Sequence, residues 1–137
     1  MSLYYVMRLS KGDHARHAET ACVFRELNEE IAAIARSLPD GELPAFLCEC
    51  GAGCTQHVSL TLAEYEGVRS HPLRFFVVHG HDVPEIDVVV EQTERFCVVE
   101  KQAPVSVRLA FARDPRRAAR RTKPPGSGVG FTPLPLA

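Results

Sequence analysis

Three cysteines fall within seven residues, at Cys48, Cys50 and Cys54, and two glycines lie between the second and the third. Cysteines this close together cannot form a framework of distant disulfides, so the cluster predicts a metal site or a redox thiol cluster. If Cys48 ends a strand, Cys48 and Cys50 project from the same face, and the glycines allow a tight return to Cys54. Three converging thiolates are typical of a structural zinc site.

A tetrahedral zinc needs a fourth ligand, and three histidines are candidates. His57 lies three residues after Cys54 and could close a compact site. His79 and His81 follow an expected strand instead, and either would tie the cluster to a sheet. A distant ligand closes a longer loop and so removes more entropy from the unfolded chain. Spacing alone leaves the three histidines open.

The residues around the cluster resemble those of a group of small bacterial proteins whose activity is uncharacterised. That group shares a C-E-C…C-T…V-x-L-T-x-x-E-Y-x-x-V-R core, followed by P-x-x-F-x-V-x-x-G-H and a valine-rich hairpin. The matching positions fall within residues 22–101 and comprise residues 46–50, 54–55 and 58–69 with Pro72, Phe75, Val77, Gly80, His81 and Glu100-Lys101. The resemblance implies His81 as the fourth zinc ligand, because the group regularly has histidine there. It implies no activity.

The first half of the chain predicts an amphipathic helix over residues 15–38. Its apolar positions recur three and four residues apart, at Phe24, Leu27, Ile31, Ile34 and Leu38. This spacing lays a narrow apolar stripe along one side of a helix. We expect the stripe to pack on the protein's own sheet, with a homodimer contact through this helix as the alternative.

Alternating or β-branched runs predict short strands, at residues 45–48, 58–62, 74–78, 86–90 and 96–99, with the last two forming a hairpin. The run Thr61-Leu62-Ala63-Glu64 fits a capping box and predicts a short second helix that ends near Ser70. Alternation from Val105 to Phe111 allows a last edge strand. The expected fold is α+β: a small antiparallel sheet, an N-terminal amphipathic helix, a short capped helix and a Cys-rich zinc knuckle.

Charge divides the chain near Ala112. Residues 1–112 carry ten basic and sixteen acidic residues, a net charge of −6, whereas residues 113–137 carry six and one, a net charge of +5. The second segment is rich in proline and glycine, so we predict one zinc-stabilised domain over 1–112 and a basic disordered tail over 113–137. Nucleic-acid phosphates are possible partners of the tail's cations, Arg113, Arg116, Arg117, Arg120, Arg121 and Lys123.

Several functional classes are disfavoured. No run approaches the roughly 18 to 20 apolar residues of a membrane span, so a cytoplasmic protein is expected. An enzyme that uses the zinc or a thiolate, with Glu49 as acid or base, is an alternative. However, the chain lacks the H-x-E…P-C-x-x-C spacing of zinc deaminases. We therefore expect a non-enzymatic structural-zinc module that binds another macromolecule, above all a protein partner.

The remaining cysteines and histidines are expected to play no part in the site. Cys22 and Cys97 fall in helix and strand patterns and are predicted to be inert core residues. His14, His17 and His71 are predicted to be solvated surface groups.

Overall fold

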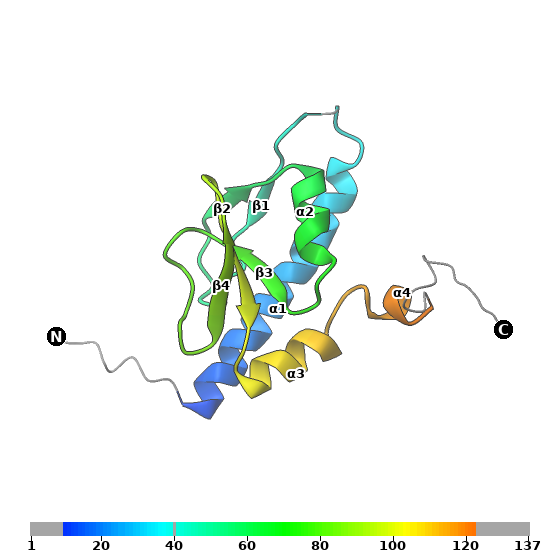
Figure 1. Cartoon of the computed structure of the whole chain (residues 1–137). Coiled ribbons are helices and arrows are strands. Elements are labelled where there is room, and N and C mark those ends of the chain that lie inside the picture. Colours follow the sequence, from blue (N-terminus) through cyan, green and yellow to red (C-terminus); the bar gives the residue numbers. More distant parts are fainter. Residues whose placement is uncertain (1–9, 40, 123–137) are drawn as a thin grey trace.

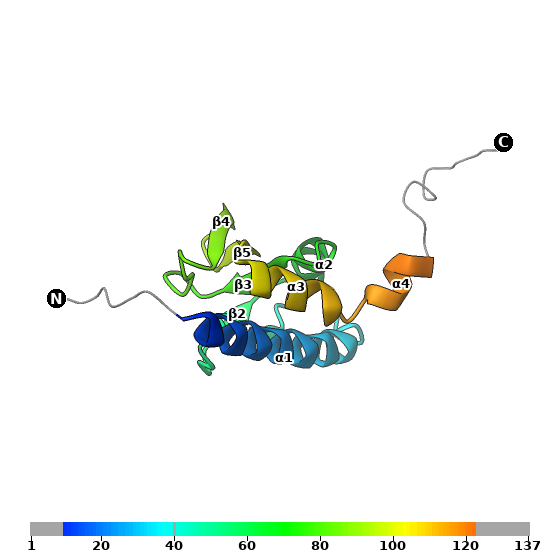
Figure 2. The same ribbon diagram turned by 90° about the horizontal axis from the view of Figure 1, so that it is seen from below.

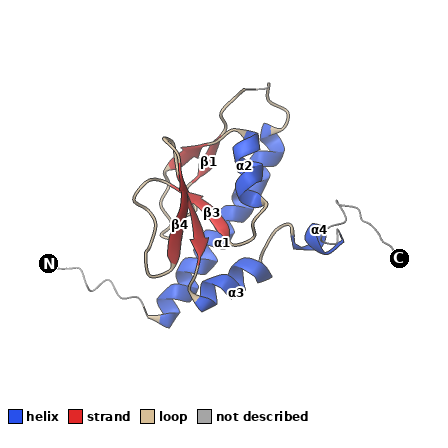
Figure 3. Cartoon of the chain, in the orientation of Figure 1, coloured by secondary structure: helices blue, strands red, loops and turns tan. Residues whose placement is uncertain are grey.

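The computed structural model describes residues 10–39 and 41–122 (Figure 1). Its elements are α1 (Lys11–Ala35), β1 (Ala45–Leu47), β2 (His57–Ser59), α2 (Leu62–Arg69), β3 (Arg74–Val77), β4 (Asp87–Gln92), β5 (Cys97–Lys101), α3 (Pro104–Ala112) and α4 (Arg117–Thr122). β1 and β2 form a two-stranded antiparallel sheet, and a second antiparallel sheet has the order β3-β5-β4. The predicted α+β class, with its N-terminal helix and its β4–β5 hairpin, is confirmed (Figure 3).

The sheets and α2 lie on one side of the long helix α1, and α3 packs beside α1 (Figure 2). Three aromatic rings join β1, α2 and β3 in the core. Phe46 stacks on Tyr65 with ring centroids 4.6 Å apart, and each ring meets Phe76 edge-on at 5.8 Å. All three residues are fully buried. This aromatic cluster fixes how the two sheets and α2 sit together.

Capping boxes begin both α1 and α2. The Ser10 hydroxyl accepts a hydrogen bond from the Asp13 amide, and the Asp13 carboxylate accepts one from the Ser10 amide. The helix therefore begins four residues before the predicted start. Thr61 and Glu64 make the same reciprocal pair, at 3.0 and 2.8 Å, which confirms the capping box predicted from the sequence.

The predicted edge strand near residues 105–111 is wrong, because this segment forms helix α3. Extended Ala103 precedes Pro104, and proline at the first helical position has no amide hydrogen to leave unpaired. Ser106 and Ala110, four residues apart, are buried against the molecule. The apolar residues of this run are compatible with both periods, so the alternation was misleading.

The predicted packing face of α1 is also wrong. Leu27, Ile34 and Leu38 are 46%, 70% and 44% exposed, whereas Phe24 and Ile31 are half-buried. The buried face consists of small and hydrogen-bonding residues: Ala18, Ala21, Cys22, Arg25, Asn28, Ala32 and Ala35. Small side chains let the helix approach the sheet and α3 closely, and the polar ones face inward because they have partners there.

Disorder predicted from residue 113 onward is wrong for residues 113–122, which pack on the acidic body. Arg116 contacts Glu29 at 2.8 Å and Glu66 at 2.6 Å, and Arg113 pairs with Glu26. These tail cations are therefore neutralised by carboxylates of α1 and α2 instead of being free for phosphates. Residues 123–137 lie outside the described residues.

We predict that Arg116→Gln lowers the free energy of unfolding by about 1 kcal/mol at neutral pH, because it removes two ion pairs. The hydrogen bond from Arg116 lowers the pKa of Glu66. A carboxylate with a lowered pKa stabilises the fold above its ordinary pKa of 4.5, and this stabilisation is lost as the pH falls through the lowered value. Denaturant melts at pH 7 and pH 3 would measure the difference.

The matched control is Arg117→Gln, because Arg117 is exposed and has no carboxylate partner among the described residues. We expect a change within about 0.5 kcal/mol. Equal effects of the two substitutions, or an Arg116 effect that does not shrink in acid, would contradict the ion-pair explanation.

Candidate metal centre

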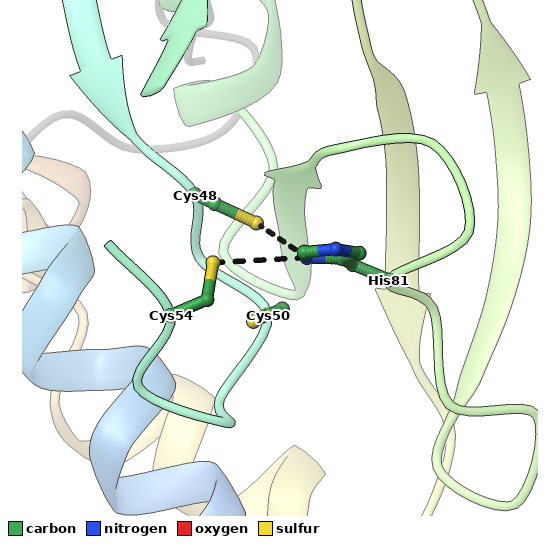
Figure 4. Close-up of side chains that lie close together, drawn as sticks. All are labelled: Cys48, Cys50, Cys54 and His81. Atoms are coloured by element: carbon green, nitrogen blue, oxygen red, sulfur yellow. Dashed lines mark hydrogen bonds between the residues drawn. The ribbon is translucent and has the colours of Figure 1, made fainter. Parts of the chain in front are cut away.

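Four potential metal ligands meet beside β1 and β3 (Figure 4). The sulfurs of Cys48, Cys50 and Cys54 and a ring nitrogen of His81 all lie within 4.8 Å of one another. His81 Nδ1 is 3.5 Å from the Cys48 sulfur and 3.7 Å from the Cys54 sulfur. Zinc–sulfur and zinc–nitrogen bonds of ordinary length give a tetrahedral S···N edge of about 3.6 Å. The four side chains are therefore positioned to bind a metal ion.

The three cysteines converge because the chain turns back on itself after β1. The Cys48 amide donates to the Gln56 carbonyl at 3.0 Å, so the pairing of the hairpin extends to Cys48 and the chain turns back after it. Gly51 and Gly53 then adopt positive φ angles of 82° and 74°, a conformation that is strained for any residue with a Cβ. The tight glycine return predicted from the sequence is what brings Cys54 back to Cys48.

His81 comes from the turn that follows β3. Its amide donates to the carbonyl of Val78 at 2.9 Å, and Gly80 between them has a φ of 85°. The Val78 amide donates to the Cys48 sulfur at 3.2 Å. The same turn therefore supplies one ligand and orients another, and it links the β1–β2 hairpin to the three-stranded sheet.

Hydrogen bonds around the sulfurs shift the pKa values of Cys50 and Cys48 in opposite directions. The Cys48 thiol and the backbone amides of Ala52 and Cys54 donate to the Cys50 sulfur, and together they lower the pKa of Cys50. The pKa of Cys48 is raised, first by the hydrogen bond between its thiol and Cys50 and second by burial. The Cys48–Cys50 hydrogen bond therefore favours the thiolate at Cys50 and the protonated thiol at Cys48. Metal binding requires both as thiolates, so it releases protons.

Glu49 lies between two ligands but is directed away from them into the core. Its carboxylate is fully buried and accepts hydrogen bonds from Arg69 at 2.9 Å, Asn28 at 2.7 Å and the Phe76 amide at 3.2 Å. The Glu49 amide in turn donates to the Phe76 carbonyl at 3.0 Å. The carboxylate suggested as an acid or base is thus occupied by structural partners.

Asn28 and Arg69 were missed as parts of this site. Besides its bond to Glu49, Asn28 accepts from the Leu47 amide at 2.8 Å and donates to the Leu47 carbonyl at 2.9 Å. It pairs with β1 as a neighbouring strand would. The only signal in the sequence was the carboxylate of Glu49 at a position that strand alternation turns inward, where it requires partners.

The prediction that His17 is solvated is wrong, because its ring is half-buried against the metal loop, the turn over residues 48–54. Burial lowers the pKa of His17. A Cβ added at Gly51 would fall closer than 3.0 Å to three atoms of this ring. His14 is also partly buried, with Nε2 3.8 Å from a carboxylate oxygen of Glu85, whereas His71 is exposed as predicted.

The other candidate residues lie outside the cluster. His57 is exposed on β2, and His79 Nδ1 is 3.4 Å from the sulfur of Cys97. Cys22 and Cys97 are buried, as predicted, and burial raises the pKa of each thiol. Within residues 10–39 and 41–122, no second group of three such ligands gathers closely enough to hold an ion.

Comparison with known proteins finds no matching family model, no similar curated protein and no similar solved structure. In the described part of the chain, none of the helices has the length and apolar character required to cross a membrane.

We predict that Gly51→Ala damages the metal loop more than Gly53→Ala. Both glycines have positive φ, so each alanine should cost about 1 to 2 kcal/mol of backbone strain. Only the alanine at Gly51 also meets the ring of His17, which adds roughly 1 to 3 kcal/mol. Thermal melts of the metal-loaded proteins would give the ranking.

A double-mutant cycle with His17→Ala isolates the contact. In that background, Gly51→Ala should cost no more than Gly53→Ala, because the clash has been removed while the strain remains. If Gly51→Ala lowers stability by the same amount in the His17→Ala background, a clash with the imidazole ring does not explain its effect.

Proposed function

We propose that this protein is a non-enzymatic zinc module, in which one Zn²⁺ held by the three cysteines and His81 joins the β1–β2 hairpin to the three-stranded sheet. The supporting observation is the convergence of the four ligand atoms within 4.8 Å, with S···N separations close to a tetrahedral edge. The ligands come from two segments that are 27 residues apart at their closest, so the ion would close a long loop.

The donor set favours zinc in a structural role. Thiolates select soft or borderline ions, and three cysteines with one histidine form a closed set typical of structural zinc. Four protein ligands leave no position for water, and three thiolates weaken the Lewis acidity of the ion. The nearby carboxylate of Glu49 is engaged by Arg69 and Asn28. The five cysteines are free, and thiolate ligands persist under reducing conditions, so we place the module in the cytoplasm.

The test is metal analysis with thermal melts. We expect about one zinc per chain, and we expect Cys54→Ser or His81→Ala to release the zinc and lower the Tm by at least about 10 °C, because metal binding and folding are linked. The matched control is His57→Ala, which removes an exposed imidazole and should change neither quantity. Full zinc occupancy in His81→Ala, or an unchanged melt after chelation, would sink the proposal.

A protein partner is the second part of the proposed function, and the exposed stripe of α1 supports it. Leu27 and Ile34 of α1, with Leu38 in the turn that follows the helix, form an apolar line that the fold leaves 44% to 70% exposed. Helical spacing places Glu19 and Glu30 along its edge. An apolar line with an acidic edge is complementary to a basic amphipathic helix.

A second copy of the chain fits this stripe less well. A twofold axis through the midpoint between Leu27 and Ile34 passes close to residue 30 and would bring Glu30 near its own copy. Like charges at the centre of an interface oppose association. We therefore propose a basic helix as the occupant in place of the homodimer.

The test uses a synthetic leucine–lysine amphipathic peptide and its leucine–glutamate counterpart. Fluorescence anisotropy should show binding of the basic peptide alone, and Ile34→Asp should abolish it. Val88→Asp is the control, because Val88 is similarly exposed on β4. Sedimentation of the free protein should report a monomer. A dimer that Ile34→Asp dissociates, or equal binding of both peptides, would contradict the proposed partner.

A further inference from the structure

A second site lies at the junction of α3 and α4, and no part of the metal centre contributes to it. A cleft of about 600 Å³ opens there, which falls within the range of small-molecule sites. Its lining residues are Pro72, Arg108, Phe111, Ala112, Asp114, Arg117 and Arg120.

Part of the lining of the cleft is apolar. Pro72, Phe111 and Ala112 form this part, and Phe111 remains 50% exposed although it belongs to a helix that packs on α1. A large aromatic ring left half in water at the wall of a cleft loses the contacts that burial would give it. An apolar or flat group placed in the cleft would restore those contacts.

Two arginines that line the cleft lack a counter-ion among the described residues, although Arg117 donates a hydrogen bond to the Ala112 carbonyl at 3.1 Å. Among exposed arginines whose side chains the structure describes, Arg16, Arg36 and Arg95 each pair with a carboxylate. Arg108 and Arg117 have no carboxylate partner in the described part of the chain, and both line this cleft. These two arginines therefore differ from the other exposed arginines, and both lie beside the same apolar residues.

The other charged residues of the lining do not neutralise Arg108 and Arg117. Asp114 is its one carboxylate, and this group is paired with Arg120. Arg120 also donates to the carbonyls of Arg69 and Ser70, which holds it against the end of α2. Three cations and one anion leave a net charge of about +2 facing the cleft.

We propose that this cleft binds a small amphipathic anion, with its apolar part against Phe111 and its carboxylate or phosphate between Arg108 and Arg117. Guanidinium groups suit such head groups because they donate two parallel hydrogen bonds. An inorganic anion would contact only the exposed arginines and would bind weakly, because exposed ion pairs contribute little free energy. A neutral chain would leave both arginines without a counter-ion.

The experiment is calorimetric titration of the full-length, zinc-loaded protein with octanoate, octan-1-ol and inorganic phosphate. We expect octanoate to bind one site with a Kd in the range of about 0.1 to 1 mM, as its size allows, and the other two probes at least about tenfold more weakly. Arg108→Gln and Arg117→Gln should each weaken octanoate binding about fivefold to tenfold, and Phe111→Ser should weaken it similarly.

Two controls match these variants. Arg16→Gln removes an exposed arginine elsewhere, and Val88→Ser removes an exposed apolar side chain from β4, so both should leave the affinity unchanged. Circular dichroism would verify that each variant is folded. Equal binding of octanol or of inorganic phosphate, or an Arg108→Gln/Arg117→Gln double variant with unaltered affinity, would overturn the proposal.

Discussion

The buried carboxylate of Glu49 is the constraint on which this fold depends most. It has no access to solvent, and burying a charge is costly unless it is paired and hydrogen-bonded. Arg69 of α2, Asn28 of α1 and the amide of Phe76 in β3 supply those bonds. A buried ion pair of this kind adds little net stability, but any arrangement that separates the partners is strongly disfavoured. The network therefore selects one relative placement of α1, α2 and β3.

This network and the metal centre meet in one three-residue segment, 48–50. Strand alternation turns Cys48 and Cys50 to one side and Glu49 to the other, so one short segment carries both anchors. A chain of 137 residues can bury only a modest core, and small domains often need a further crosslink. A metal ion held by these ligands would tie the outer side of this segment to the turn after β3, while hydrogen bonds from Asn28 and Arg69 to Glu49 tie its inner side to two helices.

Local signals in the sequence predicted much of this structure, and distant partners account for what they missed. The capping box at Thr61 and the glycine return after Cys50 depend on neighbouring residues, so both were predictable. The packed face of α1 was not, because the buried Arg25 donates to the carbonyls of Pro72 and Ala110, which lie far along the chain. Likewise, the carboxylates that hold Arg116 lie 50 and 87 residues away. Spacing alone did not distinguish His81 from His57 and His79, and the expectation that His81 is the fourth ligand came from the resemblance.

Because the packed face of α1 consists largely of small residues, selection for stability and selection for binding act on different residues of this helix. Alanines hold the helix close to the rest of the molecule, and Leu27 and Ile34 project from the opposite flank, where they are 46% and 70% exposed. Substitutions along that flank change what the surface offers to other molecules while the interior packing stays intact. During evolution, relatives with this architecture could therefore exchange one binding preference for another without first gaining stability elsewhere.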